Sequence, residues 1–278
     1  MGPLTDLDEI GLGVLAWRGY RSLDAMLDVL ERSGLPPKLG ERLVFLPQEE
    51  RQGHDIAARH GFEHAGHRDN LGIAGGFRAM AQAMSRPYLL LLENDIHLSE
   101  PCEEAVRQLG EGLRLLKCGE AQVVQLRSRR DPGEPFTGLD KYRRYHPAPD
   151  APARHRLLGA ARRLLRPGKA RRFAGTAPFA EREPERRFPD IVRRDPTTGF
   201  AFLLSRHRNW SNQPFLIERS FFLDTIMARV DAAQTTRRIN GFKTMEIELN
   251  DRWWRERDFT IAMAPGLFTH VRLGDRGY

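Results

Sequence analysis

A run of four leucines that ends in two carboxylates is the feature that most constrains the fold of this chain. Residues 88–98 read Y-L-L-L-L-E-N-D-I-H-L, and Pro87 and Pro101 bracket them. Four consecutive apolar residues are too few for an independent helix, so the run predicts a short strand buried on both faces of a parallel sheet. Glu93 and Asp95 are two positions apart, so in extended geometry their side chains point the same way. Such a pair at the carboxyl end of a strand, where open α/β sheets bind ligands, suits a hard divalent cation; the alternative is the start of a solvated loop.

The segments around the leucine run alternate between strand and helix. An apolar stretch at residues 10–17 predicts a first strand, and residues 22–32, with Ser22 as the N-cap, predict a helix with one leucine-rich face. A second strand is expected at 43–46 and a second helix at 55–60, followed by a helix at 77–84 that leads into the leucine strand. Alternation of this kind predicts an α/β fold with a mainly parallel sheet and helices on both faces.

Charge is distributed unevenly along the 278 residues. The net charge is +7, but residues 127–194 hold 19 Lys and Arg against 8 Asp and Glu, whereas residues 1–126 hold 13 against 19. Two cysteines without metal-binding spacing, and no long apolar run, argue against a disulfide framework, a zinc site and a transmembrane helix. The acidic start lacks the regions of a signal peptide, so a cytoplasmic location is expected.

A glycine-rich loop precedes the helix expected at 77–84. Residues 69–76 read D-N-L-G-I-A-G-G, and glycines at this position would let backbone N–H groups approach a phosphate. The spacing differs from the dinucleotide fingerprint G-x-G-x-x-G, so a nicotinamide enzyme is a poor fit. The alternative is a tight loop whose glycines adopt unusual backbone angles.

Taken together, the first hundred residues resemble the nucleotide-binding half of bacterial family 2 type glycosyltransferases with the GT-A fold. The resemblance implies a Rossmann-related, three-layer α/β/α sandwich with a mainly parallel central sheet. It implies that the carboxylate motif holds Mn²⁺ or Mg²⁺ on the diphosphate of a nucleotide sugar, with Asp95 as the direct ligand and Glu93 as a second metal-site residue. The donor side would comprise Trp17, Glu49, Asp69, Asn70, Gly75, Gly76, Glu93 and Asn94. Glu49 stands where the family has an Asp that binds the base. Trp17 would form one side of the base pocket, and the alternative is that it packs in the core.

The C-terminal third extends the resemblance. Strands are expected at 198–205 and 259–264, and a helix at 244–257 that carries the sequence M-E-I-E-L. The family has E-D-x-D-L on such a helix, so the resemblance implies Glu246 as the catalytic base, Glu248 as the following acid, and His270 as a late metal ligand. An inverting transfer needs a carboxylate within reach of the acceptor hydroxyl while the metal stabilises the departing diphosphate.

The basic segment at 127–194 fits the family least. Its arginine clusters, with aromatic residues between them, could contact an anionic membrane, an anionic polysaccharide or nucleic acid. Residues 156–165 predict an amphipathic helix with leucines on one face and arginines beside it, which could lie on a membrane. The alternative is an ordinary surface helix that packs its leucines on its own domain. Peripheral contact with the anionic inner face of the membrane through residues 141–194 is the interpretation that we keep, and nucleic acid is not favoured.

The sequence as a whole predicts one glycosyltransferase domain over residues 1–278. Residues 1–126 would bind the nucleotide sugar, 127–194 form a basic insertion, and 195–278 supply the acceptor and catalytic half. The expected reaction is a metal-dependent, inverting transfer from a nucleoside diphosphate sugar, UDP-linked by expectation, to a glycan or lipid-linked acceptor. The alternatives are a catalytically inactive module of the same fold that binds a polyanion, and a nucleotidyltransferase of related architecture.

Overall fold

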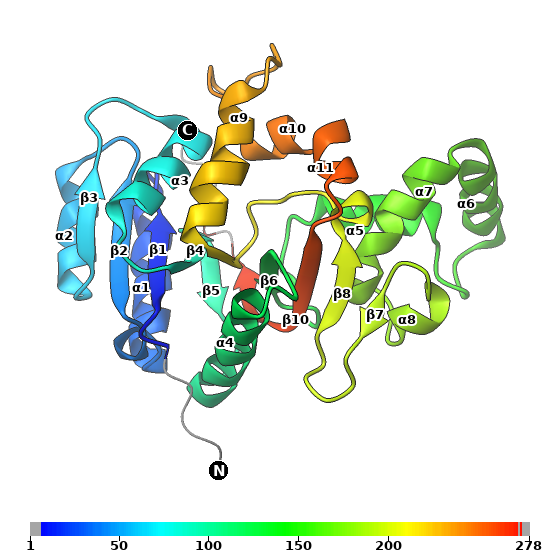
Figure 1. Cartoon of the computed structure of the whole chain (residues 1–278), viewed down its shortest axis with the longest axis horizontal. Helices are drawn as coiled ribbons and strands as arrows, with labels where there is room; N and C mark the ends of the chain where they lie inside the picture. Colours follow the sequence, from blue (N-terminus) through cyan, green and yellow to red (C-terminus); the bar gives the residue numbers. More distant parts are fainter. Residues whose placement is uncertain (1–6, 272, 274–278) are drawn as a thin grey trace.

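A central sheet of ten strands runs through residues 7–271 and 273, the part of the chain that this computed structural model describes (Figure 1). The strand order is β3-β2-β1-β4-β9-β6-β10-β8-β7, and β5 pairs with β10 off this path. The strands are β1 (Ile10–Leu15), β2 (Glu41–Leu46), β3 (Glu63–Gly66), β4 (Tyr88–Glu93), β5 (Ile96–Leu98), β6 (Val123–Arg127), β7 (Arg193–Arg194), β8 (Ala201–Leu204), β9 (Phe215–Glu218) and β10 (Thr260–His270).

The directions of the strands bring several carboxyl ends to one edge. Strands β3, β2, β1 and β4 are parallel to one another, and β9 lies antiparallel between β4 and β6, so β6 and its parallel neighbour β10 run the same way as β4. Strands β5 and β8 pair antiparallel with β10. The predicted fold class, an α/β sandwich with a mainly parallel central sheet, is therefore confirmed.

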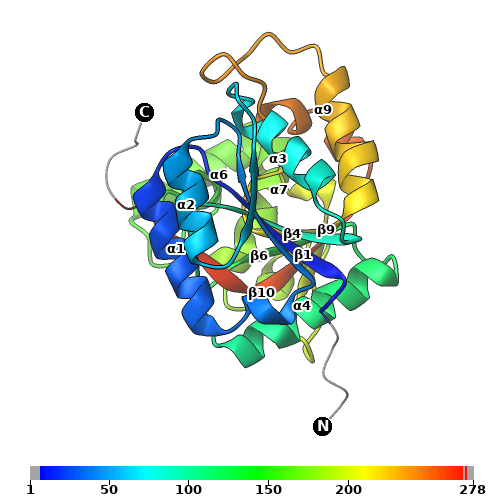
Figure 2. The same cartoon turned by 90° about the vertical axis from the view of Figure 1, so that its left-hand side faces the viewer.

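Helices cover both faces of the sheet. Figure 2 shows α1 (Tyr20–Ser33) and α2 (Arg51–Arg59) on one side of the strands, and α3 (Gly72–Ala83) and α9 (Ala228–Ala232) on the other. Helix α4 (Cys102–Lys117) packs on the α1 side, because Leu109 and Leu113 share a core cluster with the buried leucines of α1. The remaining helices are α5 (Thr137–Tyr145), α6 (Ala153–Leu165), α7 (Pro167–Phe173), α8 (Pro184–Arg187), α10 (Met245–Leu249) and α11 (Arg252–Glu256).

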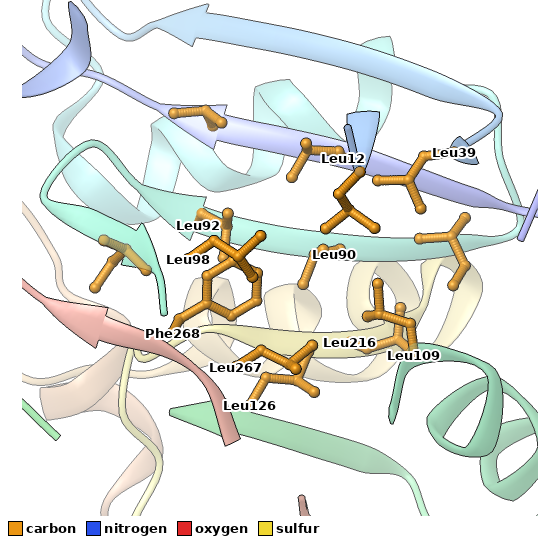
Figure 3. Close-up of a cluster of buried hydrophobic side chains, with 14 of the residues drawn as sticks. Leu12, Leu39, Leu90, Leu92, Leu98, Leu109, Leu126, Leu216, Leu267 and Phe268 are labelled. Carbon is orange, nitrogen blue, oxygen red and sulfur yellow. The ribbon is translucent and has the colours of Figure 1, made fainter. Parts of the chain in front are cut away.

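The leucine run forms the predicted buried strand. Leu89, Leu90, Leu91 and Leu92 of β4 are all fully buried, because both faces of the strand are covered. Leu90 and Leu92 point into the core under α1 and α4, and Leu89 and Leu91 point into the core under α3. Figure 3 shows Leu90 and Leu92 among leucines from β1, α4, β6 and β9, with Phe268 of β10 beside them.

Several predicted boundaries are wrong. Helix α1 begins at Tyr20, after Gly19 at φ 59°, so Ser22 is not its N-cap. Helix α3 begins at Gly72, so the glycine motif lies largely inside the helix and not before it. The helix expected at 244–257 is two short helices, because the Asp251 side chain accepts the N–H of Trp254 and starts α11 anew. The sequence reading also missed β3, β6 and β9, which are short strands, and α4, although Ala105, Leu109, Leu113 and Leu116 give that helix an apolar face at regular spacing.

Strand β10 is longer than expected and carries a bulge that matters for the site. It continues past Ala264 to His270, and its register with β6 shifts between Met263 and Phe268. Gly266, at φ 113°, lies in the shift, where a Cβ atom would be 2.3 Å from Ser128 Cα. Only glycine fits there. Beyond the bulge, His270 pairs with Ile96 of β5 and so reaches the turn after β4.

The basic segment forms helices α5 to α8 at one end of the molecule, beyond β8 and β7 (Figure 1). Helix α6 has its leucines on the outside: the exposed fractions of Leu157, Leu158, Leu164 and Leu165 are 72, 50, 82 and 78%. The helix packs on α5 and α7 of its own domain, as the alternative expected, but its leucines take no part in that packing. Among residues 7–271 and 273, no helix is both long enough and apolar enough to span a bilayer.

Candidate active site

The turn between β4 and β5 carries the acidic motif. Glu93 is the last residue of β4, opposite Leu15 of β1 in the parallel register. Asn94 is tied to the loop after β1, since its Nδ2 donates to the carbonyl oxygens of Arg18 and Gly19 at 3.2 and 3.3 Å. The motif is therefore a fixed turn at the carboxyl edge of the sheet and not a solvated loop.

Asp95 and His270 face each other across this turn. The Nε2 atom of His270 lies 2.9 Å from Oδ2 of Asp95, and its Nδ1 lies 2.6 Å from the carbonyl oxygen of Glu134. A carbonyl oxygen can only accept, so Nδ1 carries a proton. In the neutral ring the lone pair of Nε2 then faces the carboxylate of Asp95. Oδ1 of Asp95 is buried and has no hydrogen-bond partner among the described residues. A cation would satisfy both groups, so the residues present fit a divalent metal ion.

The negative charges of Asp95 and Glu246 both affect the pKa of Glu93. The pKa of Glu93 is raised to about 8, first by burial and then by the negative charges of Asp95 and Glu246, against a hydrogen bond from the Asn212 side chain. The coupling shows that Glu93, Asp95 and Glu246 share one electrostatic environment, although they come from two distant segments. In the protein alone, Glu93 keeps its proton at neutral pH.

Glu246 lines a cavity of about 460 Å³, together with Glu93 and His270. It lies in the first turn of α10, where its Oε1 accepts from Ser211 Oγ at 3.2 Å and from the Asn212 N–H at 3.3 Å. Glu248 lies elsewhere: it is fully buried, accepts from Thr235 Oγ1 at 3.2 Å, and lies 3.6 Å from Nη1 of Arg238. Of the two glutamates expected from the sequence, only Glu246 lines this cavity.

A second cavity, of about 170 Å³, adjoins the first at Glu93 and Ile73. It is lined by several of the predicted donor-side residues, namely Trp17, Asn70, Glu93, Asn94 and Asp95, together with Gly72 and Phe242. Trp17 is only partly buried, and its Nε1 donates to Oε1 of Gln48 at 3.2 Å. The tryptophan therefore belongs to a cavity wall and not to the core.

Other predicted donor-side residues lie outside both cavities. Glu49 is exposed, with its Oε2 3.6 Å from Nε2 of His54, and Asp69 is exposed next to the glycine motif. Gly75 and Gly76 lie inside α3, where a Cβ on Gly76 would be 2.7 Å from Cδ1 of Leu15. Gly76 thus allows α3 to pack closely on β1, which is a reason for glycine that does not need a ligand.

Sequence reasoning missed the polar wall of the larger cavity. Between β8 and β9, residues 208–213 (R-N-W-S-N-Q) contribute Arg208, Asn212 and Gln213, and the basic segment contributes Arg127, Lys141 and Arg172. The one available signal was the tryptophan within the polar run 208–213, since Trp210 packs edge-on against Trp254 and fixes this loop. The arginines are too far apart in sequence to form a motif.

The comparisons with known proteins give structural likeness only. No protein-family model matches the sequence, and no curated protein matches it. The chain is similar to the crystal structure of S. aureus TarS 1–349, with a TM-score of 0.49, 9% identity, and coverage of 94% of this chain and 60% of that chain. The structure of the same protein in complex with UDP-GlcNAc matches with a TM-score of 0.49 and 9% identity, and the match covers 96% of this chain and 59% of that chain. The mannosyltransferase PcManGT from Pyrobaculum calidifontis, in complex with GDP-Man and Mn²⁺, matches with a TM-score of 0.37 and 12% identity. That match covers 43% of this chain and 35% of that chain. The chain thus spans about three fifths of the length of the TarS 1–349 chain.

Proposed function

We propose that this chain transfers a sugar from a nucleoside diphosphate sugar to a glycan or lipid-linked acceptor, with a divalent cation. The observation that carries the proposal is that two cavities meet at Glu93. Asp95 lines the smaller cavity and Glu246 lines the larger one. His270 also lines the larger cavity, and it contacts Asp95. The family resemblance of the sequence supports the same assignment. In this proposal residues 1–126 bind the donor and residues 195–278 supply the base and the late histidine.

Asp95 and His270 would hold the cation. Within the described residues, no group of three or more His, Cys, Asp or Glu side chains is arranged to hold a metal ion. Diphosphate oxygens and water would therefore complete the coordination, as Mg²⁺ commonly requires. A cation bound there would stabilise the charge on the departing diphosphate.

Glu246 would accept the proton of the acceptor hydroxyl. Both hydrogen bonds from Ser211 and Asn212 go to its Oε1, and within the described residues its Oε2 accepts none. Oε2 is therefore the oxygen that an acceptor hydroxyl can reach. The nucleotide is proposed to bind in the smaller cavity and the acceptor in the larger one. Attack from the larger cavity, with the diphosphate leaving on the other side, is a single displacement that inverts the sugar carbon.

A thermal-shift screen of UDP-, GDP- and other nucleotide sugars tests this function. One class of donor is expected to raise the melting temperature by about 5 °C at 100 times its Kd when Mn²⁺ is present, and much less with a chelator. Stabilisation by a polyanion such as heparin without any by a nucleotide sugar would instead indicate the non-catalytic binding module. Metal-dependent stabilisation by nucleoside triphosphates alone would indicate a nucleotidyltransferase.

We also propose that helix α6 rests on an anionic membrane surface. Gly159 is its buried residue, packed on Pro147, and the arginines 162 and 163 donate to carbonyl oxygens of α5. At about 100° per residue, the exposed leucines lie on the opposite side of the helix from Gly159. A surface helix normally turns its apolar side inward, and this one does the reverse. With exposed basic residues at 154 and 156 in the helix and at 166 and 169 just after it, this part of the surface matches a bilayer that carries negative charge.

Replacing Leu164 and Leu165 together by serine is expected to weaken binding to phosphatidylglycerol-containing vesicles at least about tenfold. Burying a leucine is worth about 1.5–3 kcal/mol, and both side chains are almost fully exposed in the protein, so the fold loses little. Reversing the charge of Arg166 and Lys169 should weaken binding in a salt-dependent way. Co-sedimentation measures both. The matched control is Ile239→Ser, an exposed apolar residue outside α6, and equal binding by the leucine variant and the parent would contradict the proposal.

A further inference from the structure

The larger cavity has a cationic wall without carboxylate partners. Four basic side chains line it: Arg127, Lys141, Arg172 and Arg208. None of the four forms an ion pair with an Asp or Glu side chain among the described residues, although most arginines of the acidic N-terminal half do form such pairs. Buried cations in proteins are usually paired with acids. Arg127 and Arg208 are buried without such an ion pair in the described part of the chain, so this wall requires an explanation.

Arg208 and Arg127 are the most deeply buried of the four, each with 5% of its surface exposed. The guanidinium of Arg208 is the one held on three sides by other side chains. All three contacts are to neutral oxygens: Nε donates to Oε1 of Gln125 at 2.9 Å, Nη1 to Thr176 Oγ1 at 3.3 Å, and Nη2 to Oε1 of Gln213 at 3.2 Å. Burial and the nearby charge of Arg127 lower the pKa of Arg208 to about 9. The protein thus orients this cation firmly and leaves its charge uncompensated.

Arg127 is also held by neutral groups, and Arg172 and Lys141 complete the wall. Arg127 donates to the carbonyl oxygens of Pro132 and Gly133 at 2.5 and 2.9 Å, and its guanidinium stacks over the Phe136 ring at 4.1 Å. Arg172 has a buried Nε with no hydrogen-bond partner among the described residues. Lys141, on α5, is exposed and lines the same cavity. Carboxylates lie near Arg127, at Glu134, Asp95 and Asp131. None of them forms an ion pair with a cation of the wall among the described residues, which leaves these groups available to an anion.

We propose that the larger cavity binds an acceptor that carries a phosphate or a carboxylate, beside the hydroxyl that is glycosylated. This inference rests on the proposed function, since it deepens the acceptor side of that site. The cations come from the basic segment and the loop after β8, whereas the smaller, donor-side cavity is lined by the turn after β4 and the glycine motif. The same cavity holds Glu246, so an anion bound by Lys141 and Arg172 would place a neighbouring hydroxyl on the side of the proposed base.

The basic segment then has a role at the site as well as at its surface. Helices α5 and α7 turn Lys141 and Arg172 toward the cavity, while α6, which contacts both, presents its leucines outward. Such a wall selects an acceptor with an anionic group over a neutral glycan, because a neutral ligand would leave the buried charge of Arg208 without an anionic partner.

NMR titration of the full chain, with Mg²⁺ and without donor, tests the proposal with three probes: glucose 6-phosphate, glucuronate and glucose. At least one anionic probe is expected to bind about tenfold or more tightly than glucose, which corresponds to about 1.4 kcal/mol. The variant Lys141→Gln with Arg172→Gln should lose that preference. Arg172→Lys, which keeps the charge, should retain most of it. The matched control is Arg171→Gln, an exposed arginine next to Arg172 that does not line the cavity.

Two results would overturn the proposal. One is an equal affinity of the parent for glucose and for both anionic probes. The other is a double variant that keeps the preference but loses nucleotide-sugar affinity, which would assign these cations to the phosphates of the donor. If no nucleotide sugar binds the parent, yet the anion preference depends on Lys141 and Arg172, the anionic site stands and the proposed transferase function fails.

Discussion

Replacing Glu246 by glutamine is expected to depress sugar transfer by about 10²- to 10⁴-fold while donor and metal affinity stay nearly unchanged. The amide keeps the volume and can still accept from Ser211 and Asn212, but it cannot take the proton of the acceptor hydroxyl. Steady-state kinetics, with donor binding measured in parallel, separate kcat from affinity.

Glu248→Gln is the control for this prediction. Glu248 belongs to the same short helix but is fully buried and faces Thr235 and Arg238, away from the cavity. Its removal is expected to affect stability and not the proton transfer. Loss of transfer in the Glu248 variant with a normal Glu246 variant would move the base to Glu248. Normal transfer in both variants would mean a retaining mechanism or another base.

The leucine strand, the acidic turn and the β-α-β-α order were predictable from sequence because each depends on local patterns. Four buried leucines between prolines allow few structures, and acid at the end of such a strand points to the ligand-binding edge. The resemblance also named His270, which the structure places 2.9 Å from Asp95. Its position depends on the bulge at Gly266, which no periodicity could indicate.

Other parts of the site depend on contacts between distant segments. The break between α10 and α11 follows from the capping of Trp254 by Asp251, which directs Trp254 into the core and leaves Glu246 in the cavity. The cationic wall combines residues 127, 141, 172 and 208, and only the folded chain brings them together. The leucines of α6 left two interpretations open for a different reason: periodicity predicts an amphipathic helix but cannot say which of its faces is covered.

The second large effect is expected at Asp95. Asn at this position keeps the shape of the turn but removes the charge opposite His270, so Mn²⁺-dependent binding of the nucleotide sugar should weaken by more than about tenfold. The melting temperature without ligand should change little. His270→Ala should act in the same direction but less strongly, because Asp95 and the diphosphate remain as ligands.

Isothermal titration calorimetry of the donor found in the thermal screen, with the parent and the Asp95→Asn variant, tests the central claim most directly. The titrations are carried out with Mn²⁺ and with a chelator. We predict that the parent binds the nucleotide sugar with Mn²⁺ and much more weakly with the chelator, and that the variant shows the weak affinity under both conditions. Equal, metal-dependent binding by parent and variant would contradict the assignment of Asp95 as the residue that holds the metal on the donor.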